Sequence, residues 1–352
     1  MPDAHYPRAR VLVLGAGGFI GGHVARLVAG DPGIAEGIFA SRLRRAHPPR
    51  FAGRGRWTSF NLVEDTALSL RRLLEQVRPD VIVNCVGATA GSPAQLEQLN
   101  VVTVVKLLSA LAYGRPAHLV HLGSAAEYGP TKEWGPVPES AEVRPASYYG
   151  ATKLAATELV CEAVESGQVS ATVLRVFNAI GAGNPTSTLV GQAVRTLSEA
   201  RRAASHAVTF GPLDGGRDFI DVRDVARAVL AASRPGYGAG LPTVVNVGRG
   251  IPVSSRWVVH RLARIAHFDG EIVEEGQGSP RSGTVSWQWA DTTVARAALG
   301  WSPRYLLSEA LDQAWWANSP ARYGRLHLVP TGAIGASTAP MPSRPEVPAN
   351  VP

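Results

Sequence analysis

The feature that most constrains the fold of this sequence is a glycine-rich turn between an apolar run and a helical segment. The run Arg10 to Leu14 is short and apolar, as in a buried strand of a parallel sheet. Gly15 to Gly22 follows, and His23 to Val28 has a helical pattern. Glycines at such a turn let the backbone approach a pyrophosphate, which rests on the positive end of the helix. The order therefore predicts the opening of a dinucleotide-binding domain.

The spacing of these glycines is G-x-x-G-x-x-G, not the G-x-G-x-x-G of most dehydrogenases. From this turn we expect cofactor contacts at Gly15, Gly18, Phe19, Ile20 and Gly21.

Strand and helix patterns alternate over the first half of the chain. Strands are expected over 37–42, 80–87, 118–124 and 171–178, with helices over 68–77, 96–112 and from Tyr149. Such alternation predicts an α/β fold, a Rossmann-type doubly wound parallel sheet covered on both faces. The smaller substrate domain is expected to be discontinuous and C-terminal. The predicted Rossmann domain comprises 9–178 with 208–232 and 241–250 returning to it, the substrate domain 179–207 and 251–317, and a Pro-rich disordered tail 318–352.

Composition limits the kinds of partner. The chain has 352 residues, a net charge of +7 and a pI near 9.8. Its arginines are scattered and lack zinc spacing or an aromatic-basic stripe, so we expect no nucleic acid partner, and a phosphate-bearing small molecule suits the charge. No apolar run of ~18 residues or signal peptide is seen, so no membrane partner is expected. Two cysteines, Cys85 and Cys161, in apolar settings suit reduced thiols in a cytoplasm.

The end of the second expected strand bears on the choice of cofactor. An NAD-binding protein usually places an acid there, to accept from the ribose 2′-hydroxyl. This chain has Ser41-Arg42 instead. A hydroxyl and a guanidinium suit a 2′-phosphate, which a carboxylate would repel. The sequence therefore favours NADP(H), although a solvated arginine loop is the alternative.

A tyrosine and a lysine four residues apart form the next candidate site. Lys106, Lys132 and Lys153 are the only lysines of the chain, and Lys153 follows Tyr149 at helical i,i+4 spacing. A close ammonium lowers the pKa of a phenol from its reference near ~10, so the phenol can exchange a proton near neutral pH. The alternative is an ordinary amphipathic pair.

Ser124 ends the expected strand 118–124, at the sheet edge where open α/β folds bind ligands. A hydroxyl, a phenol and a lysine beside a nicotinamide suit hydride transfer at a carbonyl carbon. A helix cap is the alternative for Ser124.

Taken together, these motifs resemble the extended short-chain dehydrogenases/reductases. The resemblance runs from about Val11 to Trp316 and includes Tyr149-Gly-Ala-Thr-Lys153, Arg175-Val-Phe-Asn178 and Arg217-Asp-Phe-Ile-Asp-Val. It implies a Rossmann domain, a nicotinamide cofactor and a nucleotide-diphosphate sugar substrate. The stretch Phe210 to Asp224 is most similar to reductases of 4-keto-6-deoxy nucleotide sugars.

The resemblance also implies roles for individual residues. Ser124 would bind the substrate carbonyl, Tyr149 would be the acid, and Lys153 would hold the nicotinamide ribose. The cofactor would further contact Asn61 and Leu62 near the adenine, and Asn84 and Gly87; Asn100 would order a relay water. The substrate would contact Asn178, Arg217 and Arg281, while Glu127 is either a sugar ligand or a surface carboxylate.

The expected activity is NADPH-dependent reduction of the C4 ketone of an NDP-4-keto-6-deoxyhexose. Ala125-Ala126 stands where sugar 4,6-dehydratases carry Asp-Glu, so dehydration lacks its acid and base. An NAD-dependent nucleotide-sugar 4-epimerase, with the same catalytic residues, is the alternative. A non-catalytic NADP-binding regulator is a third, which need not keep the Ser, Tyr and Lys set.

Two further expectations come from resemblance alone. The arginine-rich, lysine-poor composition resembles high-GC actinobacterial proteins, among which such reductases often make deoxysugars for antibiotics; thymidine diphosphate is therefore favoured over guanosine diphosphate. Members of the family often form a homodimer through a four-helix bundle, here from Leu96 to Ala112 and Tyr149 to Ala163.

Overall fold

The computed structural model describes residues 8–42, 55–131, 134–234, 240–276 and 285–318. Arg281 and the predicted tail from 319 onward lie outside the described residues. Within the described part, no helix has both the length and the apolar character needed to cross a bilayer.

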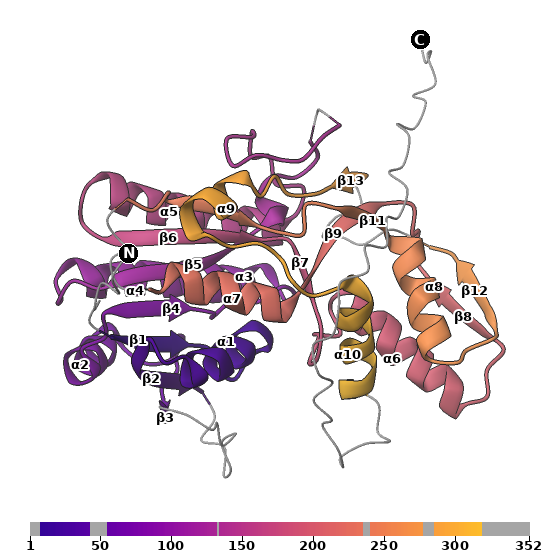
Figure 1. The fold of residues 1–352 in the computed structure, drawn as a ribbon, viewed down its shortest axis with the longest axis horizontal. Helices are drawn as coiled ribbons and strands as arrows, with labels where there is room; N and C mark the ends of the chain where they lie inside the picture. Colours follow the sequence, from indigo (N-terminus) through magenta and orange to yellow (C-terminus); the bar gives the residue numbers. More distant parts are fainter. Residues whose placement is uncertain (1–7, 43–54, 132–133, 235–239, 277–284, 319–352) are drawn as a thin grey trace.

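A seven-stranded sheet forms the centre of the larger part of the molecule (Figure 1). Its order is β10-β6-β5-β4-β1-β2-β3, and every neighbouring pair is parallel. The strands are β1 (Ala9–Leu14), β2 (Ile34–Ser41), β3 (Gly55–Ser59), β4 (Val81–Asn84), β5 (His118–Ser124), β6 (Ser170–Val176) and β10 (Val244–Val247). The doubly wound parallel sheet expected from the sequence is therefore confirmed, with β3 as an edge strand that the sequence pattern did not reveal.

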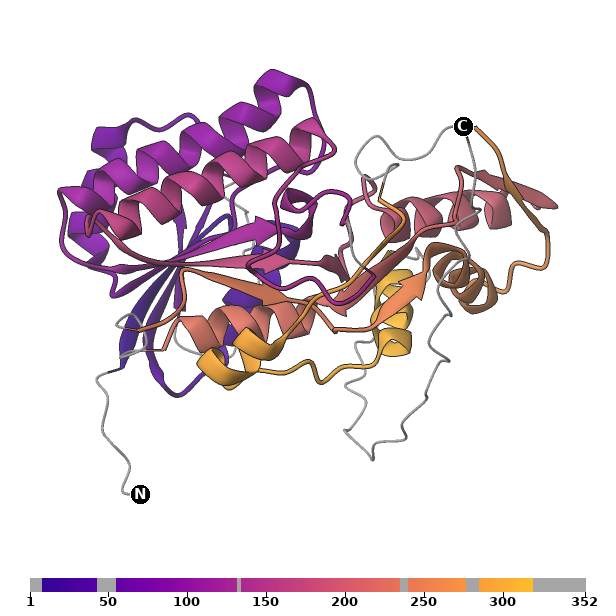
Figure 2. The same cartoon turned by 90° about the horizontal axis from the view of Figure 1, so that it is seen from above.

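Helices cover both faces of this sheet, as Figure 2 shows. Alternate residues of β1 enter different cores: Val11 and Val13 pack with one helical layer, Leu12 and Leu14 with the other. The first layer comprises α1 (Phe19–Gly30), α7 (Val222–Ala232) and α9 (Thr293–Leu299); the second comprises α2 (Ala67–Val77), α4 (Thr103–Ala112) and α5 (Tyr148–Glu165). Burial on both faces explains why these strands read as continuous apolar runs.

The helix expected over 96–112 begins earlier and contains a π-helical turn. It runs through α3 (Pro93–Glu97), the π-helical η1 (Gln98–Val102) and α4. Asn100 lies in the π turn and is buried, with its amide bonded to Ala88 O at 3.1 Å and to Thr152 Oγ1 at 3.0 Å. The turn thus places a polar side chain between the helix and α5.

The smaller part of the molecule has two short sheets and its own core. Strand β9 (Gly216–Asp221) pairs with β7 (Asn178–Ile180), β11 (Pro252–Ser254) and β13 (Trp287–Gln288), while β8 (Ala207–Phe210) pairs with β12 (Glu271–Glu274). Helices α6 (Leu189–Arg202), α8 (Ser255–Ile265) and α10 (Leu307–Asn318) pack together beside them (Figure 1).

Two of the expected domain boundaries differ from those that the packing shows. We expected 208–232 to return to the Rossmann domain, but β8 and β9 pair only within the small sheets, and packing in the core of the large sheet begins with Ile220 near the end of β9 and continues in α7. We expected 251–317 to belong to the substrate domain, but Leu299 and Trp301 are buried in the core of the large sheet. Short apolar elements carry no local signal for which of two cores they join, so these boundaries depended on tertiary packing.

Candidate active site

The glycine turn between β1 and α1 fits the pyrophosphate of a dinucleotide. Gly15 has φ +76°, and Gly18 N donates to Gly15 O at 2.9 Å. A Cβ on Gly21 would lie 2.2 Å from Gly15 O, so only glycine allows this approach of helix to strand. The turn therefore leaves bare main chain at the start of α1, as anion binding at a helix N-terminus requires.

A cavity of about 280 Å³ opens beside this turn at the carboxyl ends of β1, β2 and β4. Its lining includes seven of the predicted cofactor residues: Gly15, Gly18, Ser41, Arg42, Asn61, Leu62 and Gly87. The Oγ of Ser41 lies 3.3 Å from where a Cβ on Gly17 would be, so this hydroxyl sits directly beside the turn. We call this space the cofactor cavity.

A lysine from α4 holds one wall of the cofactor cavity. Lys106 Nζ donates to the carbonyls of Leu62 at 2.8 Å, Val63 at 3.2 Å and Asp65 at 2.6 Å. Asn61 is fixed by local bonds, since its Oδ1 accepts from Val63 N and its own N–H donates to Asp65 Oδ2. The loop after β3 is therefore held in place by hydrogen bonds between its main chain and the side chains of Lys106, Asn61 and Asp65.

Asn84 does not line the cofactor cavity, contrary to our expectation. Its side chain is fully buried, its Oδ1 accepts from Val86 N at 3.1 Å, and its Nδ2 lies 3.2 Å from His121 Nδ1. Asn84 supports the turn behind the cavity, while Gly87 reaches the cavity itself.

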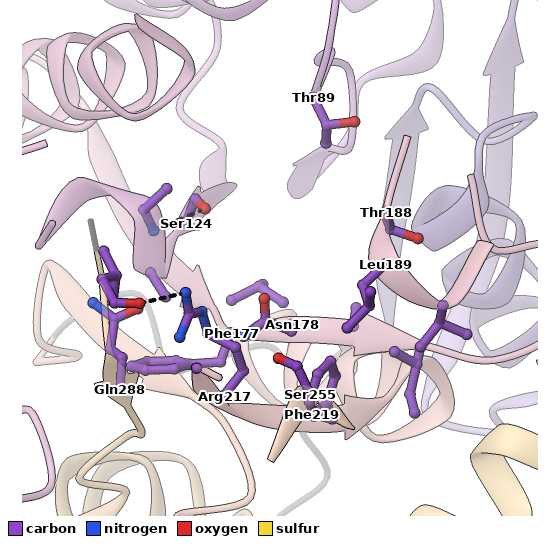
Figure 3. Close-up of a pocket in the computed structure, with 18 of the residues that line it drawn as sticks. Thr89, Ser124, Phe177, Asn178, Thr188, Leu189, Arg217, Phe219, Ser255 and Gln288 are labelled. Atoms are coloured by element: carbon purple, nitrogen blue, oxygen red, sulfur yellow. Dashed lines mark hydrogen bonds between the residues drawn. The ribbon is translucent and has the colours of Figure 1, made fainter. Parts of the chain in front are cut away.

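A larger cavity of about 530 Å³ lies between the two parts of the molecule (Figure 3). Ser124, Tyr149, Asn178 and Arg217 all line it, although they come from β5, α5, β7 and β9. Phe19 and Ile20, expected at the cofactor, also line this cavity, at the start of α1. In Figure 3, Thr188 and Leu189 lie across the cavity from Ser124. We call this space the catalytic cavity.

Ser124 is both a helix cap and a residue of the catalytic cavity, so the two interpretations hold together. It is the N-cap of a short 3-10 helix, η2 (Ala125–Glu127), and its Oγ accepts from Ala126 N at 3.2 Å. Because the oxygen is the acceptor in that bond, the hydroxyl hydrogen is not used in it. The Ser124 hydroxyl can therefore donate to an oxygen in the cavity.

Tyr149 and Lys153 lie on the same face of α5, as the i,i+4 spacing predicts. The helix starts one residue before Tyr149, with Ser147 as its N-cap accepting from Gly150 N at 3.1 Å. Lys153 is buried, and its Nζ donates to Leu122 O on β5 at 2.5 Å. Burial lowers the pKa of Lys153 to about 8, while the nearby Glu127 carboxylate acts to raise it. The lysine therefore carries its charge at neutral pH. Tyr149 lines the catalytic cavity, whereas Lys153 lines neither cavity.

Glu127 occupies neither of the places that we expected. It is not a surface carboxylate, because none of its surface is exposed, and it does not border the catalytic cavity. Its Oε1 accepts from Ser124 N at 2.7 Å, and its Oε2 pairs with Arg175 Nε at 2.7 Å. Both oxygens are engaged within the protein, so the surface interpretation is wrong and no geometry supports contact with a sugar hydroxyl.

The predicted substrate residues Asn178 and Arg217 are held by main-chain carbonyls. Asn178 Nδ2 donates to Asp218 O at 3.1 Å, and the guanidinium of Arg217 donates to Gly216 O at 2.8 Å, Ser286 O at 2.9 Å and Val285 O at 2.7 Å. Burial lowers the pKa of Arg217 to about 10. Arg217 thus brings a positive charge to the wall of the catalytic cavity; Arg281 lies outside the described residues.

The sequence did not reveal several residues of the catalytic cavity. Gln288 lines it from β13 and donates to Gly129 O at 3.0 Å, which connects the two parts of the molecule. Thr89 also lines the catalytic cavity, and its Oγ1 lies 2.9 Å from Ser187 Oγ. A two-residue strand and a loop threonine have no periodicity or motif that would indicate their position.

The sheet, the glycine turn and the Ser124, Tyr149 and Lys153 set define an enzyme of the short-chain dehydrogenase/reductase class that uses a nicotinamide cofactor. Residues 11–248 match the family described as "NAD dependent epimerase/dehydratase family". The chain belongs to this family, the extended short-chain dehydrogenases/reductases that act on nucleotide sugars.

Three known proteins illustrate the similarity. The chain is 39% identical over 324 residues to a dTDP-6-deoxy-L-talose 4-dehydrogenase (NAD(P)(+)) of Kitasatospora kifunensis, covering 91% of this chain and 99% of that protein. The solved structure of MoeE5 with UDP-glucose and NAD has a TM-score of 0.72 at 25% identity, covering 87% and 97%. RMD from Pseudomonas aeruginosa with NADPH has a TM-score of 0.67 at 25% identity, covering 88% and 98%.

Proposed function

We propose that this protein uses NADPH to reduce the C4 ketone of an NDP-4-keto-6-deoxyhexose. We further propose that the nucleotide of this sugar is thymidine diphosphate rather than guanosine diphosphate. The observation that carries the proposal is that Ser124 and Tyr149 line the same cavity. The Ser124 Oγ accepts the bond from Ala126 N, so its hydrogen is not used in that bond. Two O–H donors at one cavity wall suit a carbonyl oxygen on which negative charge grows.

Similarity to the Kitasatospora protein supports the position of the chemistry. That protein is named for oxidation at C4 of a dTDP-6-deoxyhexose. Oxidation of that alcohol and reduction of the corresponding ketone pass through the same transition state, so one site serves both directions. We therefore extend the C4 position and the thymidine nucleotide from that relative to this chain.

The residues of this chain would share the work as follows. Ser124 and Tyr149 would donate hydrogen bonds to the substrate oxygen, and these bonds would strengthen as its charge develops. Tyr149 would then give its proton to that oxygen, while Lys153 stabilises the phenolate that remains. When bound, the nicotinamide cofactor supplies the hydride. Ala125 and Ala126 line the cavity without a carboxylate, which agrees with a reaction that does not remove water from the sugar.

The wall of the cofactor cavity supports NADPH over NADH. Ser41 and Arg42 line it beside the glycine turn, at the end of β2 where an NAD-binding chain usually carries an acid. A guanidinium and a hydroxyl can bind a 2′-phosphate. Among the relatives, MoeE5 was solved with NAD and RMD with NADPH, so the family accommodates both.

A single incubation tests the reaction. The purified protein is mixed with NADPH and a panel of dTDP- and GDP-4-keto-6-deoxyhexoses, and the products are identified by NMR. Formation of the 4-hydroxy sugar with loss of NADPH absorbance supports the proposal. If no keto sugar is reduced, but a 4-hydroxy nucleotide sugar is inverted without added cofactor, the protein is instead a 4-epimerase. Binding of NADPH with no turnover of any of these sugars would favour a non-catalytic regulator.

A further inference from the structure

A buried ion pair lies directly beneath the catalytic serine. Glu127 is fully buried at the end of η2, and Arg175 comes from the neighbouring strand β6 with its side chain 7% exposed. The guanidinium also lies over the ring of Tyr128, with its Cζ 4.7 Å from the ring centroid. Burying two charges is costly unless both are paired and hydrogen-bonded, so such a pair inside a core calls for a reason beyond stability.

The carboxylate is joined to the main chain of Ser124. Glu127 Oε1 accepts from Ser124 N, while Ser124 Oγ accepts from Ala126 N, and the two bonds form a capping box around η2. The preceding residue is Gly123. A larger residue would not fit there, because its Cβ would lie 2.8 Å from Glu127 Oε1. The main chain of Ser124 is therefore held by Glu127, and its Oγ is held by Ala126 N.

The same carboxylate also acts electrostatically on Lys153, whose pKa it acts to raise. Lys153 Nζ bonds Leu122 O, and Glu127 bonds Ser124 N, two residues further along β5. The other titratable groups that act on Lys153 are Cys85 after β4 and His121 on β5. Burial raises the pKa of the Cys85 thiol to about 12 and lowers that of His121 well below its usual value, so both are neutral near pH 7. Burial raises the pKa of Glu127, while the paired Arg175 guanidinium acts to lower it, so the negative charge that supports the lysine depends on Arg175.

We propose that Glu127, anchored by Arg175, is a positioning residue for the reaction: it orients the Ser124 hydroxyl through the main chain, and its charge holds the Lys153 ammonium in place. The proposal rests on the proposed function for its effect on turnover. Its effect on cofactor binding is independent of that function, because the family resemblance assigns Lys153 to the nicotinamide ribose whatever the sugar is.

Glu127→Gln tests the charge while keeping the side-chain shape and an acceptor for Ser124 N. Removing the carboxylate lowers the pKa of Lys153 further, so its charge is lost at lower pH and NADPH binding weakens there. Displacement of the alkaline limb by one pH unit would make the variant bind NADPH about tenfold more weakly than the unmodified protein at pH 8.5, with near-equal affinity at pH 6. The measurement is NADPH fluorescence titration across this pH range.

The double variant Glu127→Gln/Arg175→Gln provides a second test in case Glu127→Gln alone does not fold. It does not leave the Arg175 guanidinium without its partner, and its alkaline limb should return part of the way to that of the unmodified protein, since the opposing positive charge is also gone. Asp224→Asn is the matched control: Asp224 is buried, pairs with Arg227 at 2.7 Å, accepts from Arg304 N and Tyr305 N, and lines neither cavity. It should lower the melting temperature without moving the pH profile.

The outcomes separate the two proposals. If the folded Glu127 variants bind NADPH with the same pH dependence as the unmodified protein, Glu127 has only a structural role and this inference is overturned. If the unmodified protein reduces no keto sugar, the proposed function fails, yet the binding profiles still decide the role of Glu127. If turnover is observed, Glu127→Gln should leave kcat at pH 6 nearly unchanged, because glutamine keeps the acceptor for Ser124 N, whereas Glu127→Ala, which removes that acceptor, should lower it.

Discussion

The cofactor cavity and the catalytic cavity are built in different ways. The cofactor cavity is lined by the ends of neighbouring parallel strands, with glycines and main chain at its wall and a loop tied by Lys106. The catalytic cavity draws side chains from β5, α5, β7 and β9 and from β13, so both parts of the molecule contribute to it (Figure 3). One site is made by the fold itself, and the other by side chains that the fold brings together.

This contrast predicts which measurement each cavity controls. Changes at the cofactor cavity should alter cofactor affinity and leave the chemical step intact. Changes to the donors of the catalytic cavity should alter kcat, and changes to its charged wall should alter substrate affinity. Variants of single residues test whether each cavity controls its own measurement.

The largest effect is expected for Tyr149→Phe. Loss of the phenolic proton removes the general acid, whose contribution is typically ~10²–10⁴-fold in rate. The ring remains, so NADPH affinity should change little. Steady-state kinetics with a reducible keto sugar, alongside NADPH titration, checks both parts. An unchanged kcat would remove Tyr149 from the reaction.

Ser124→Ala should cost about 10²–10³-fold in kcat, the usual loss for one donor to a developing oxyanion. Because Ser124 also caps η2, the variant should lose a little stability as well. Ser124→Thr keeps the hydroxyl and the cap, and serves as the control. A fall in kcat that matches the fraction of unfolded protein would contradict the catalytic role.

Arg217→Met should raise the KM for the nucleotide sugar by about 10–100-fold, the range expected for loss of a hydrogen bond to a charged group. Methionine keeps much of the apolar length, so the wall of the cavity is retained. NADPH affinity should stay the same, since Arg217 lies on the catalytic cavity alone. A rise in the NADPH dissociation constant equal to the rise in KM would break the division between the cavities.

Arg42→Ala should reduce the preference for NADPH over NADH by about tenfold, through loss of one charge-assisted bond to the 2′-phosphate. At saturating NADPH, kcat should be unchanged. Paired titrations with the two cofactors give the ratio. Equal or tighter NADH binding by the unmodified protein would show that Ser41 and Arg42 do not select the cofactor.

The smallest effect on activity is expected for Val105→Glu, which tests the homodimer. Val102 and Val105 are 38% and 45% exposed on the η1 and α4 segments, and Tyr148 is 48% exposed at the start of α5. A charge there should give monomers in sedimentation at micromolar concentration, with kcat per subunit nearly unchanged, because both cavities lie within one chain. Monomers of the unmodified protein would rule out the dimer.

The sequence predicted the central sheet and the catalytic set because their signals are local. The glycine turn, the strand ending at Ser124 and the i,i+4 pair on α5 are each contained within a few residues. The turn lines the cofactor cavity and Ser124 and Tyr149 line the catalytic cavity, while Lys153 lines neither. The place of Glu127 could not be predicted in this way. Its partner Arg175 is 48 residues away, and only packing of η2 against β6 reveals the pair.

The positions of Gln288 and Trp301 could not be predicted from the sequence for the same reason. Gln288 reaches the catalytic cavity from a two-residue strand that exists only by pairing with β9. Trp301 joins the core of the large sheet from a segment with no strand or helix of its own, where its Nε1 donates to Asp224 O at 3.1 Å. Such positions are set by contacts between distant segments, which periodicity does not encode.

The three carbonyls that surround Lys106 give the molecule a built-in spectroscopic reference. An ammonium has three N–H groups, and those of Lys106 have the carbonyls of Leu62, Val63 and Asp65 within reach, so its rotation and its hydrogen exchange should be slow. Selective ¹⁵N labelling of lysine would give signals from only three side chains: Lys106, Lys153 and Lys132, the last outside the described residues. In such a spectrum the slowly exchanging Lys106 signal serves as the intensity reference, and the signal of Lys153 should change as the pH passes about 8, so the charge on the buried lysine could be followed directly.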